Sequence, residues 1–447
     1  MTGWLDQVFR LRPGEKRLVF TLGVLLFGNA VAQPLAEITA VSNFLTQVGV
    51  NDILIIWMLD AGLALLITGA QSLIIDRFDR RKLLQVLCAA LVMIFAVLWL
   101  LTVLQAPDWL NYGLLYLVAQ QQWLFFPLVF WILASDILDT AQSKRLFPLM
   151  ASLGFAGRLT GILLALAYPA LALRLGLGTT SVLLFCGATY LLSLVVIAVG
   201  LRDVKIRKRV VKVEPVRATL TEGWNFVRLV PVFRFLAIIL VAMIFCETFL
   251  EFHFLSVSEQ VFSNPQSYQT FYSLYRLGIT VASMAVQAFL ASRIIGRIGL
   301  KNTFLILPVC ALAGSVWMLA MVSSIVAAVG GVVMQKLPQF TVDEMARKEF
   351  QTLVPEERRG RVSIFMDSYL FVAGSLGGCL ITLAVVYAGV RLGWANYAYA
   401  YLAAAVVASL VGIWAALRLR AIYDTSMLNW RLRRRGRGAS VLDKLDF

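Results

Sequence analysis

The sequence predicts an all-α polytopic membrane protein with twelve transmembrane helices in two pseudo-symmetric six-helix bundles. The chain has 447 residues, of which 60% are hydrophobic and only 15% are charged. Soluble proteins carry more charge than this. A charged loop at 76–82 separates two long apolar segments, and a weaker copy at 293–301 separates two more. Arg80 and Arg297 in these loops are 217 positions apart (297 − 80), close to half of the chain, which indicates two related halves in tandem.

Twelve segments are long and apolar enough to cross about 30 Å of hydrocarbon. The first segment is longer than a membrane requires and contains Pro34, so we expect a kink or an extended outer end there. The predicted spans cover residues 18–47, 53–75, 83–104, 110–134, 147–169, 181–201, 231–256, 269–292, 303–323, 325–347, 362–388 and 393–417.

The basic residues of the loops predict the orientation and the domain boundaries. Lys and Arg gather after the even-numbered spans and are rare after the odd-numbered ones, which places both termini in the cytoplasm. We expect five parts in chain order: an interfacial N-terminal segment (1–17), a first six-helix bundle (18–201), a cytoplasmic linker (202–230), a second bundle (231–417) and a basic cytoplasmic tail (418–447).

The composition argues against several classes of function. The net charge of +15 comes from loops on one side of the membrane, so it predicts attraction to anionic lipids and not to nucleic acid. His253 is the sole histidine and the five cysteines lie inside apolar segments, so we expect no metal site and no cofactor. The sequence has neither a phosphate-binding Gly-x-x-x-x-Gly-Lys-Ser/Thr loop nor a Gly-x-Ser-x-Gly elbow. These absences argue against an ATP-driven pump and against an enzyme.

The loop after the second span resembles the loop signature of the major facilitator superfamily. Asp79 stands where that signature usually has a glycine, and the alternative is a basic loop that reports orientation alone. The resemblance implies alternating access, with these residues latching the cytoplasmic ends of the bundles. The predicted latch consists of Asp76, Arg77, Arg80, Arg81 and Lys82.

A second resemblance concerns residues 130–149. This segment has an aromatic pair, an acidic turn and then Ala-Gln-x-Lys-Arg-Leu-Phe-Pro, and it resembles the fourth-to-fifth-span region of the ATP/ADP translocases of plastids and intracellular bacteria. Residues 353–362 resemble the start of the eleventh span of that family. The resemblance implies that nucleotides are moved by exchange or by proton-coupled uptake. Arg158 departs from it, since a small or apolar residue is expected there.

Glycine pairs repeat at the same offset in the two halves. Gly157 and Gly161 in the fifth span correspond to Gly374 and Gly378 in the eleventh. Small residues four positions apart let helix backbones approach closely. Close packing alone would account for them, and helices at these positions would also line a central cavity in a two-bundle transporter.

Two cations are predicted near the midplane of the membrane, Arg158 in the fifth span and Lys336 in the tenth. A charge that faces lipid at this depth is costly, so both are expected to face the interior. Two unpaired cations would bind an anion such as a phosphate group. The alternative is that a nearby glutamate neutralises each of them.

Five further charges fall in the outer halves of spans. The carboxylates are candidates for proton coupling or for a gate, namely Glu37, Asp60, Glu247 and Glu251, and Arg276 is also a candidate substrate-binding residue. Asp60 and Arg276 occupy nearly equivalent places in the two halves (276 − 60 = 216). They are either gate residues that close the outer mouth or static charges that are satisfied within their own halves. Glu247 and Glu251 share a helix face. Two carboxylates this close cannot both ionise easily, so the pair is a candidate proton carrier. Alternatively, each pairs with a cation such as Arg276.

Amide side chains recur in the fourth and tenth spans. Gln122 in the fourth span corresponds to Gln335 and Gln339 in the tenth. Amides at this depth can hydrogen-bond a base or a sugar, and they can equally join helices without any ligand.

The sequence therefore predicts a monomeric secondary transporter of the bacterial inner membrane. We expect a small anionic substrate, nucleotides included, to bind between the bundles near the midplane. The alternatives are a major facilitator transporter for another organic anion or an amphiphile, and a non-transporting membrane scaffold or sensor.

Overall fold

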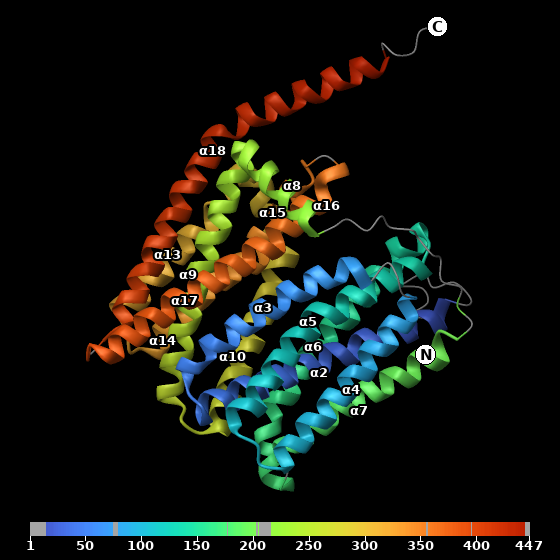
Figure 1. Ribbon diagram of the computed structural model, residues 1–447, viewed down its shortest axis with the longest axis vertical. Helices are drawn as coiled ribbons and strands as arrows, with labels where there is room; N and C mark the ends of the chain where they lie inside the picture. The colour runs from blue at the N-terminus through green and yellow to red at the C-terminus, as the bar shows by residue number, and fades with distance from the viewer. Residues whose placement is uncertain are drawn as a thin grey trace. The chain divides into compact units, whose positions relative to one another are not determined.

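The computed structural model describes residues 15–74, 79–176, 178–202, 204, 216–354, 356–394 and 396–442. Within these residues the chain is helical and contains no β-strand (Figure 1). Twelve helical segments in the described part are long and apolar enough to cross a membrane, which confirms the twelve predicted spans. The five cysteines lie in these helices as free thiols, and four of them are buried.

The first compact unit comprises residues 1–213 and 258–280. The last turn of α9 and most of α10 therefore group with helices from the first half of the sequence. The six helices that belong wholly to this unit are α2 (Glu15–Gln47), α3 (Val50–Ile74), α4 (Arg80–Val103), α5 (Asp108–Ile137), α6 (Thr140–Leu175) and α7 (Thr179–Gly200).

Helix α2 is the central helix of this unit, since it packs on α5, α6 and α7. Its contact with α6 depends on the predicted glycine pair. A Cβ on Gly157 would lie 2.6 Å from the carbonyl oxygen of Phe27, and one on Gly161 would meet the carbonyl oxygen of Val31. The two backbones are thus as close as glycine permits, which confirms the packing role predicted for these glycines.

The second compact unit comprises residues 214–257 and 281–447. Helices α9 and α10 run across the boundaries of the two units in sequence. The helices of this part of the chain are α8 (Val216–Leu229), α9 (Pro231–Val261), α10 (Pro265–Val286), α11 (Ser292–Ile298), α12 (Leu300–Thr303), α13 (Ile306–Ala320), α14 (Ile325–Pro338), α15 (Glu344–Gln351), α16 (Glu356–Ile364), α17 (Leu370–Arg391) and α18 (Ala398–Leu442).

In the described residues of this unit, three π-helical turns interrupt the spans, namely η1 (Gln287–Ala291), η2 (Gln339–Asp343) and η3 (Phe365–Tyr369). A π turn widens the helix locally and occurs often at functional sites. Pro338 immediately precedes η2 and cannot donate a backbone hydrogen bond, so the helical ladder is already weakened there.

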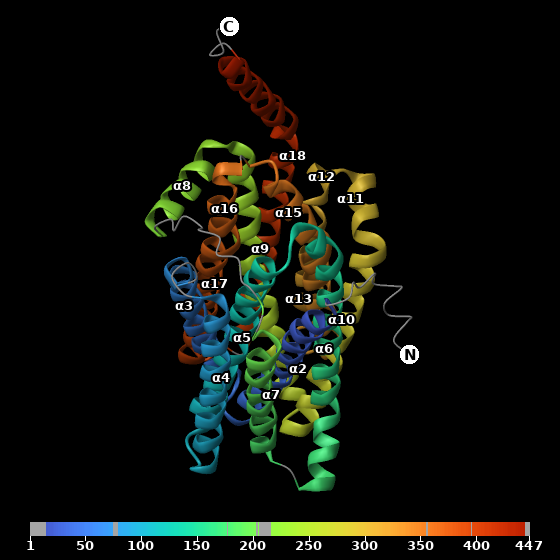
Figure 2. The ribbon, with the colours of Figure 1, turned by 90° about the vertical axis from the view of Figure 1, so that its right-hand side faces the viewer.

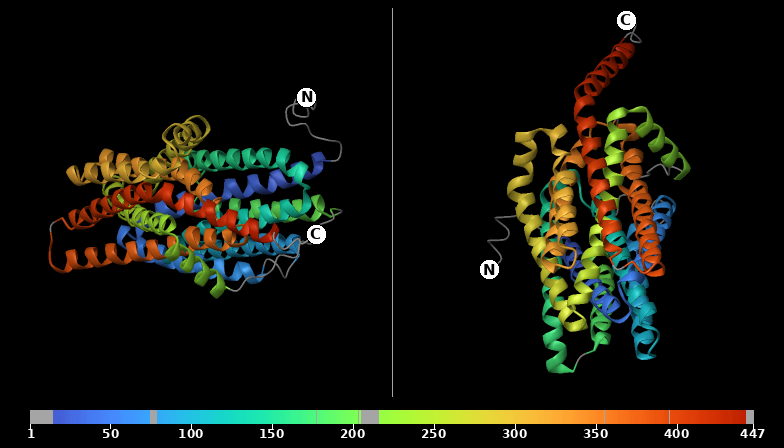
Figure 3. Two further views of the ribbon diagram at one scale, coloured as in Figure 1. Left: turned by 90° about the horizontal axis from the view of Figure 1, so that it is seen from above. Right: turned by 90° about the vertical axis from the view of Figure 1, so that its left-hand side faces the viewer.

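The structure adds detail to the segments expected outside the bundles. Residues 216–229 of the expected linker form the amphipathic helix α8, which lies beside α16 (Figure 2). Helix α18, drawn in red in Figure 3, continues without a break from the last span to Leu442. Residues 1–14 of the expected interfacial segment lie outside the described residues, and α2 begins at Glu15.

Candidate functional site

Lys336 on α14 lies at the centre of a charged cluster in the second unit. Its Nζ donates to Glu251 Oε1 at 2.8 Å and lies 3.7 Å from Glu247 Oε1. Gln339 Nε2 donates to Glu247 Oε2 at 2.8 Å, and Gln335 Nε2 donates to Gln339 Oε1. Five predicted site residues from α9, α14 and η2 therefore converge on one place.

Helical spacing accounts for this convergence. Glu247 and Glu251 are four positions apart on α9, so both carboxylates point to the same side. Gln335 and Gln339 have the same spacing across the junction of α14 and η2, beside Lys336. Lys336 is thus neutralised by glutamates, which was the alternative considered for it, and the two glutamates share this one cation.

A second charged pair lies in the first unit. Arg276 Nη2 on α10 donates to Glu37 Oε2 on α2 at 2.7 Å, and Gln33 Nε2 donates to the same carboxylate oxygen at 3.0 Å. Asp60, which was considered together with Arg276, instead accepts a 2.9 Å hydrogen bond from Gln121 Nε2 on α5. Arg276 on α10 is therefore paired with Glu37 on α2 and not with Asp60.

Arg158 on α6 differs from the other intramembrane cations of the described residues. Its guanidinium lies 4.8 Å from the ring centroid of Trp123 on α5, a cation–π arrangement. It has neither a hydrogen-bond acceptor nor an ion-pair partner among the described residues, and its Nε atom is buried. The charges of Arg276 and Glu37 are close enough to act on it. Arg158 therefore carries a positive charge that no carboxylate of the described residues contacts.

Gln122 on α5 is also left without partners. Its side chain is 1% exposed, and neither its Nε2 nor its Oε1 atom has a hydrogen-bond partner in the described part of the chain. A buried amide in this condition loses hydrogen bonds that it would make in water. Such a group is expected to have a ligand or water as its partner in the working protein.

The two clusters have opposite charge balances. Arg158, Arg276 and Glu37 sum to one excess positive charge, whereas Lys336, Glu247 and Glu251 sum to one excess negative charge when both carboxylates are ionised. The first arrangement favours an anion. The second favours the uptake of a proton, since two carboxylates compete for one cation.

The predicted latch is described in part. Asp76 and Arg77 lie outside the described residues. Arg80 is buried at the start of α4, and its Nε lies 3.2 Å from Asp136 Oδ2 on α5. Arg81 Nη1 donates to the carbonyl oxygen of Arg202, and Lys82 is exposed. The acidic residue that meets the basic loop within the described part is thus Asp136.

The Ala-Gln-x-Lys-Arg motif has a structural role in this chain. Asp139 caps α6 through a reciprocal capping box with Gln142. Gln142 Nε2 also donates to Glu15 Oε1 at 3.1 Å, and Arg145 pairs with the same carboxylate at 3.0 Å. The motif therefore fixes the start of α6 and ties it to the start of α2.

A further ion-pair cluster was not assigned from the sequence. Arg347 Nε on α15 lies 2.9 Å from Asp343 Oδ2, and Asp367 in η3 accepts from Lys348 and from Gln351. The four-residue spacing of Asp343 and Arg347 was a signal for the first of these contacts. The contact with Asp367 depends on tertiary packing.

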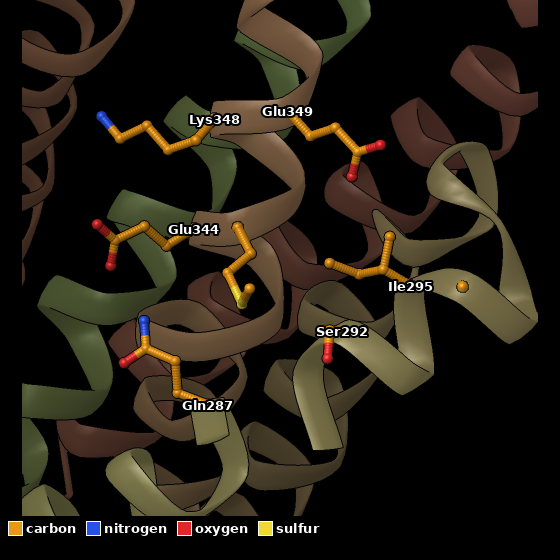
Figure 4. Close-up of a pocket in the computed structure, with 8 residues that line it drawn as sticks. Gln287, Ser292, Ile295, Glu344, Lys348 and Glu349 are labelled. Carbon is orange, nitrogen blue, oxygen red and sulfur yellow. The ribbon is translucent and has the colours of Figure 1, made fainter. Parts of the chain in front are cut away.

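A cavity of about 560 Å³ lies in the second unit beside η1, α11 and α15. In Figure 4, Glu344 and Lys348 project to one side of α15 and Glu349 to the other. Lys348 pairs with Asp367, and none of the residues of the Lys336 cluster lines this cavity. The labelled lining residues are Gln287, Ser292, Ile295, Glu344, Lys348 and Glu349.

His253 is buried on α9, where its Nδ1 lies 2.9 Å from the hydroxyl of Tyr401. This contact joins α9 to α18.

Solved structures of several transporters share this fold. A point mutant of the nucleoside transporter NupG superposes with a TM-score of 0.64 at 13% identity, over 91% of this chain and 100% of that one. The peptide transporter PepTSo of the POT family gives 0.60 at 14% identity, over 89% and 98% of the two chains. A bacterial homologue of the iron transporter ferroportin gives 0.60 at 14%, over 91% and 100%. Identities this low show the fold alone.

No curated protein matches the sequence. The family model of the Major Facilitator Superfamily matches residues 139–378, which is more than half of the chain. Together with the twelve spans and the shared fold, this match shows that the protein belongs to the Major Facilitator Superfamily.

Proposed function

We propose that the protein is a secondary active transporter that works by alternating access and moves nucleotides or related phosphorylated anions. The observation that carries this proposal is Arg158, an intramembrane cation with no acidic partner among the described residues. An unpaired charge at this depth costs several kcal/mol, on the order of 3 kcal/mol on insertion scales, and marks a substrate pathway more often than a structural contact. An anionic substrate would remove this cost.

The surroundings of Arg158 suit a nucleotide. A guanidinium can hold a phosphate through two parallel hydrogen bonds. Trp123 is 53% exposed and offers an aromatic face on which a base can stack. Gln122 precedes it on the same helix with an unsatisfied amide. In this proposal Arg158 binds phosphate, and the resemblance to ATP/ADP translocases stays a prediction.

The glutamates of the second unit supply a means of coupling. Glu247 and Glu251 share Lys336, so the addition of one proton to the pair brings the cluster to neutrality. Proton-coupled uptake would use this step. Exchange of one nucleotide for another would leave the protonation state of the two glutamates unchanged. In this proposal the protein is a monomer in a bacterial inner membrane. Both termini lie in the cytoplasm, since the basic residues gather in the loops after the even-numbered spans.

The experiment that tests the proposal compares Arg158→Ala with Arg174→Ala. Arg174 lies on the same helix but is exposed, so its loss changes the net charge equally. Purified protein is titrated with a nucleotide and with the matching nucleoside, and binding is measured by isothermal calorimetry. Arg158→Ala is expected to weaken nucleotide binding about tenfold or more, because charge-assisted hydrogen bonds contribute about 1.5–3 kcal/mol.

Nucleoside binding should be unchanged in Arg158→Ala, and Arg174→Ala should resemble the wild type with both ligands. Equal weakening for nucleotide and nucleoside would refute the assignment of Arg158 to phosphate. If neither compound binds the wild-type protein, and uptake into proteoliposomes is absent for a panel of phosphorylated metabolites, the phosphorylated substrate class is excluded.

A further inference from the structure

A second cavity, of about 580 Å³, lies in the second unit beneath the amphipathic helix α8. Helix α9 contributes Ala237, Val241 and Phe245 to its lining, while Leu370 of α17 and Val411 of α18 contribute from the sides. These side chains are apolar, and their spacing along α9 follows one face of the helix. The cavity is therefore an apolar crevice that runs along α9.

The surface next to this crevice is apolar as well. Phe371 on α17 is 46% exposed, and Val407 and Leu410 on α18 are 59% and 50% exposed. In a chain that spans a membrane, such side chains face acyl chains. The crevice is therefore in reach of lipid molecules from the side.

Two arginines lie at the α8 end of the crevice. Arg228 on α8 and Arg234 on α9 both line it and are both exposed. Neither has an ion-pair partner among the described residues, and the guanidinium of Arg234 lies 5.5 Å from the ring centroid of Phe235 in a cation–π arrangement. Trp224 on α8 lines the same end and is 56% exposed, as expected of an aromatic side chain at the membrane interface.

We propose that this crevice is a binding site for one anionic phospholipid, whose phosphate pairs with Arg228 and Arg234 while an acyl chain lies along α9. Charge complementarity selects the occupant, since two unpaired cations at the mouth of an apolar groove match a negative head group on a hydrocarbon chain. The basic loops place this end of the span at the cytoplasmic leaflet, which holds the anionic lipids. The proposal depends on the membrane location and not on the transported substrate.

Helix α8 gives the bound lipid a mechanical connection. Glu222 on α8 pairs with Arg358 at 3.2 Å and with Arg361, both on α16, and α16 leads through η3 into α17. A lipid that holds Arg228 therefore holds a helix already joined to the start of the eleventh span. The lipid would fix α8 against α9 and α16.

The experiment uses native mass spectrometry of the full-length protein with phosphatidylglycerol and with phosphatidylcholine of the same acyl chains. The wild type is expected to retain phosphatidylglycerol preferentially. Arg228→Ala/Arg234→Ala should lower its apparent affinity about thirtyfold, since each basic residue near the surface contributes a factor of about five. Arg293→Ala/Arg297→Ala is the matched control, because these exposed arginines of the same unit do not line the crevice and should leave binding unchanged.

A second pair of variants tests the apolar part of the site. Ala408 lines the crevice and Val407 beside it does not, so Ala408→Phe should reduce lipid retention while Val407→Phe should not. Equal retention of the two lipids, or equal losses in the two double-arginine variants, would overturn the proposal. Displacement of the lipid by glycerol phosphate alone would show an anion site without a chain groove, and displacement by an amphipathic peptide but not by lipid would show a protein-docking groove; either result would also overturn it.

Discussion

Arg276 Nη2 and Glu37 Oε2 lie 2.7 Å apart, although the two residues are 239 positions apart in the sequence. The side chains are 16% and 7% exposed. The pair joins α10, which follows the midpoint of the chain, to α2, the central helix of the first unit. A buried ion pair adds little net stability, but the loss of one member leaves a charge that is costly to bury.

Glu37→Gln and Arg276→Gln are each expected to lower the stability of the protein by about 3–5 kcal/mol, because each breaks the ion pair and leaves its other member charged. The double variant should recover much of that loss, since neither member of the pair then carries a charge. Thermal unfolding of purified protein, followed by size-exclusion chromatography after heating, measures the effect. Additive losses in the double variant would show that the two side chains act independently.

The pH dependence of transport should reside in the two glutamates that share Lys336. If uptake is proton-coupled, it should rise as the outside pH falls, and Glu251→Gln should flatten this dependence while Glu247 remains as a partner for Lys336. Gln339 and Arg347 are further polar groups near Glu247, and Gln335 donates to Gln339. Uptake into proteoliposomes across a range of pH values tests this expectation.

Glu349→Gln is the control for that measurement, because Glu349 is an exposed carboxylate of the same unit. It should keep the wild-type pH profile. A full pH dependence in Glu247→Gln/Glu251→Gln would exclude the proton-carrier role of this pair.

The ion pair of Arg80 and Asp136 should matter for stability far more than its exposed neighbour Lys82. The two side chains are only 9% and 5% exposed, so Arg80→Ala is expected to cost about 3–5 kcal/mol. Lys82→Ala should change stability by about 0.5 kcal/mol or less. Equal melting temperatures for the two variants would argue against a structural role for the pair, and partial recovery in Arg80→Asp/Asp136→Arg would support it.

Gly161→Ala should destabilise the contact between α2 and α6. The new methyl group would lie against the backbone of Val31 and 2.7 Å from the ring of Pro34, neither of which can move aside easily. Overpacking of this kind costs about 1–3 kcal/mol. Gly62→Ala on α3 is the control, since in the described part of the chain nothing beyond the helix's own backbone and the two chain neighbours lies within 4 Å of a Cβ there. It should be neutral or stabilise the helix by about 0.5–1 kcal/mol, and a larger loss than for Gly161→Ala would contradict the close-approach argument.

The twelve spans could be predicted because a transmembrane helix is specified by its own residues. An apolar stretch of sufficient length must bond its backbone internally in hydrocarbon, whatever its neighbours are. The π turns were not predictable in this way. Pro338 weakens the helical hydrogen bonding before Gln339–Asp343. The turn at Phe365–Tyr369 depends on packing against other helices.

The candidate site was predictable in its members but not in its pairings. The cost of burial identifies Lys336, Glu251 and Arg276 as residues that need partners, and it does not say which carboxylate faces which cation. That choice depends on the rotation of α9, α10 and α14 about their axes. Gln121 shows the same limit, since its amide meets Asp60 while the adjacent Gln122 meets nothing among the described residues.

The burial of the native thiols makes the protein a suitable background for labelling at introduced cysteines. Cys88, Cys186, Cys246 and Cys379 are buried, and only Cys310 of the five is partly accessible. Maleimide reagents should therefore react slowly with the native chain. Replacement of Cys310 by serine gives a protein with little background labelling, in which the four buried cysteines are kept. Pairs of cysteines can then be introduced at chosen positions, and the distance between two spin labels or fluorophores can be followed through a transport cycle.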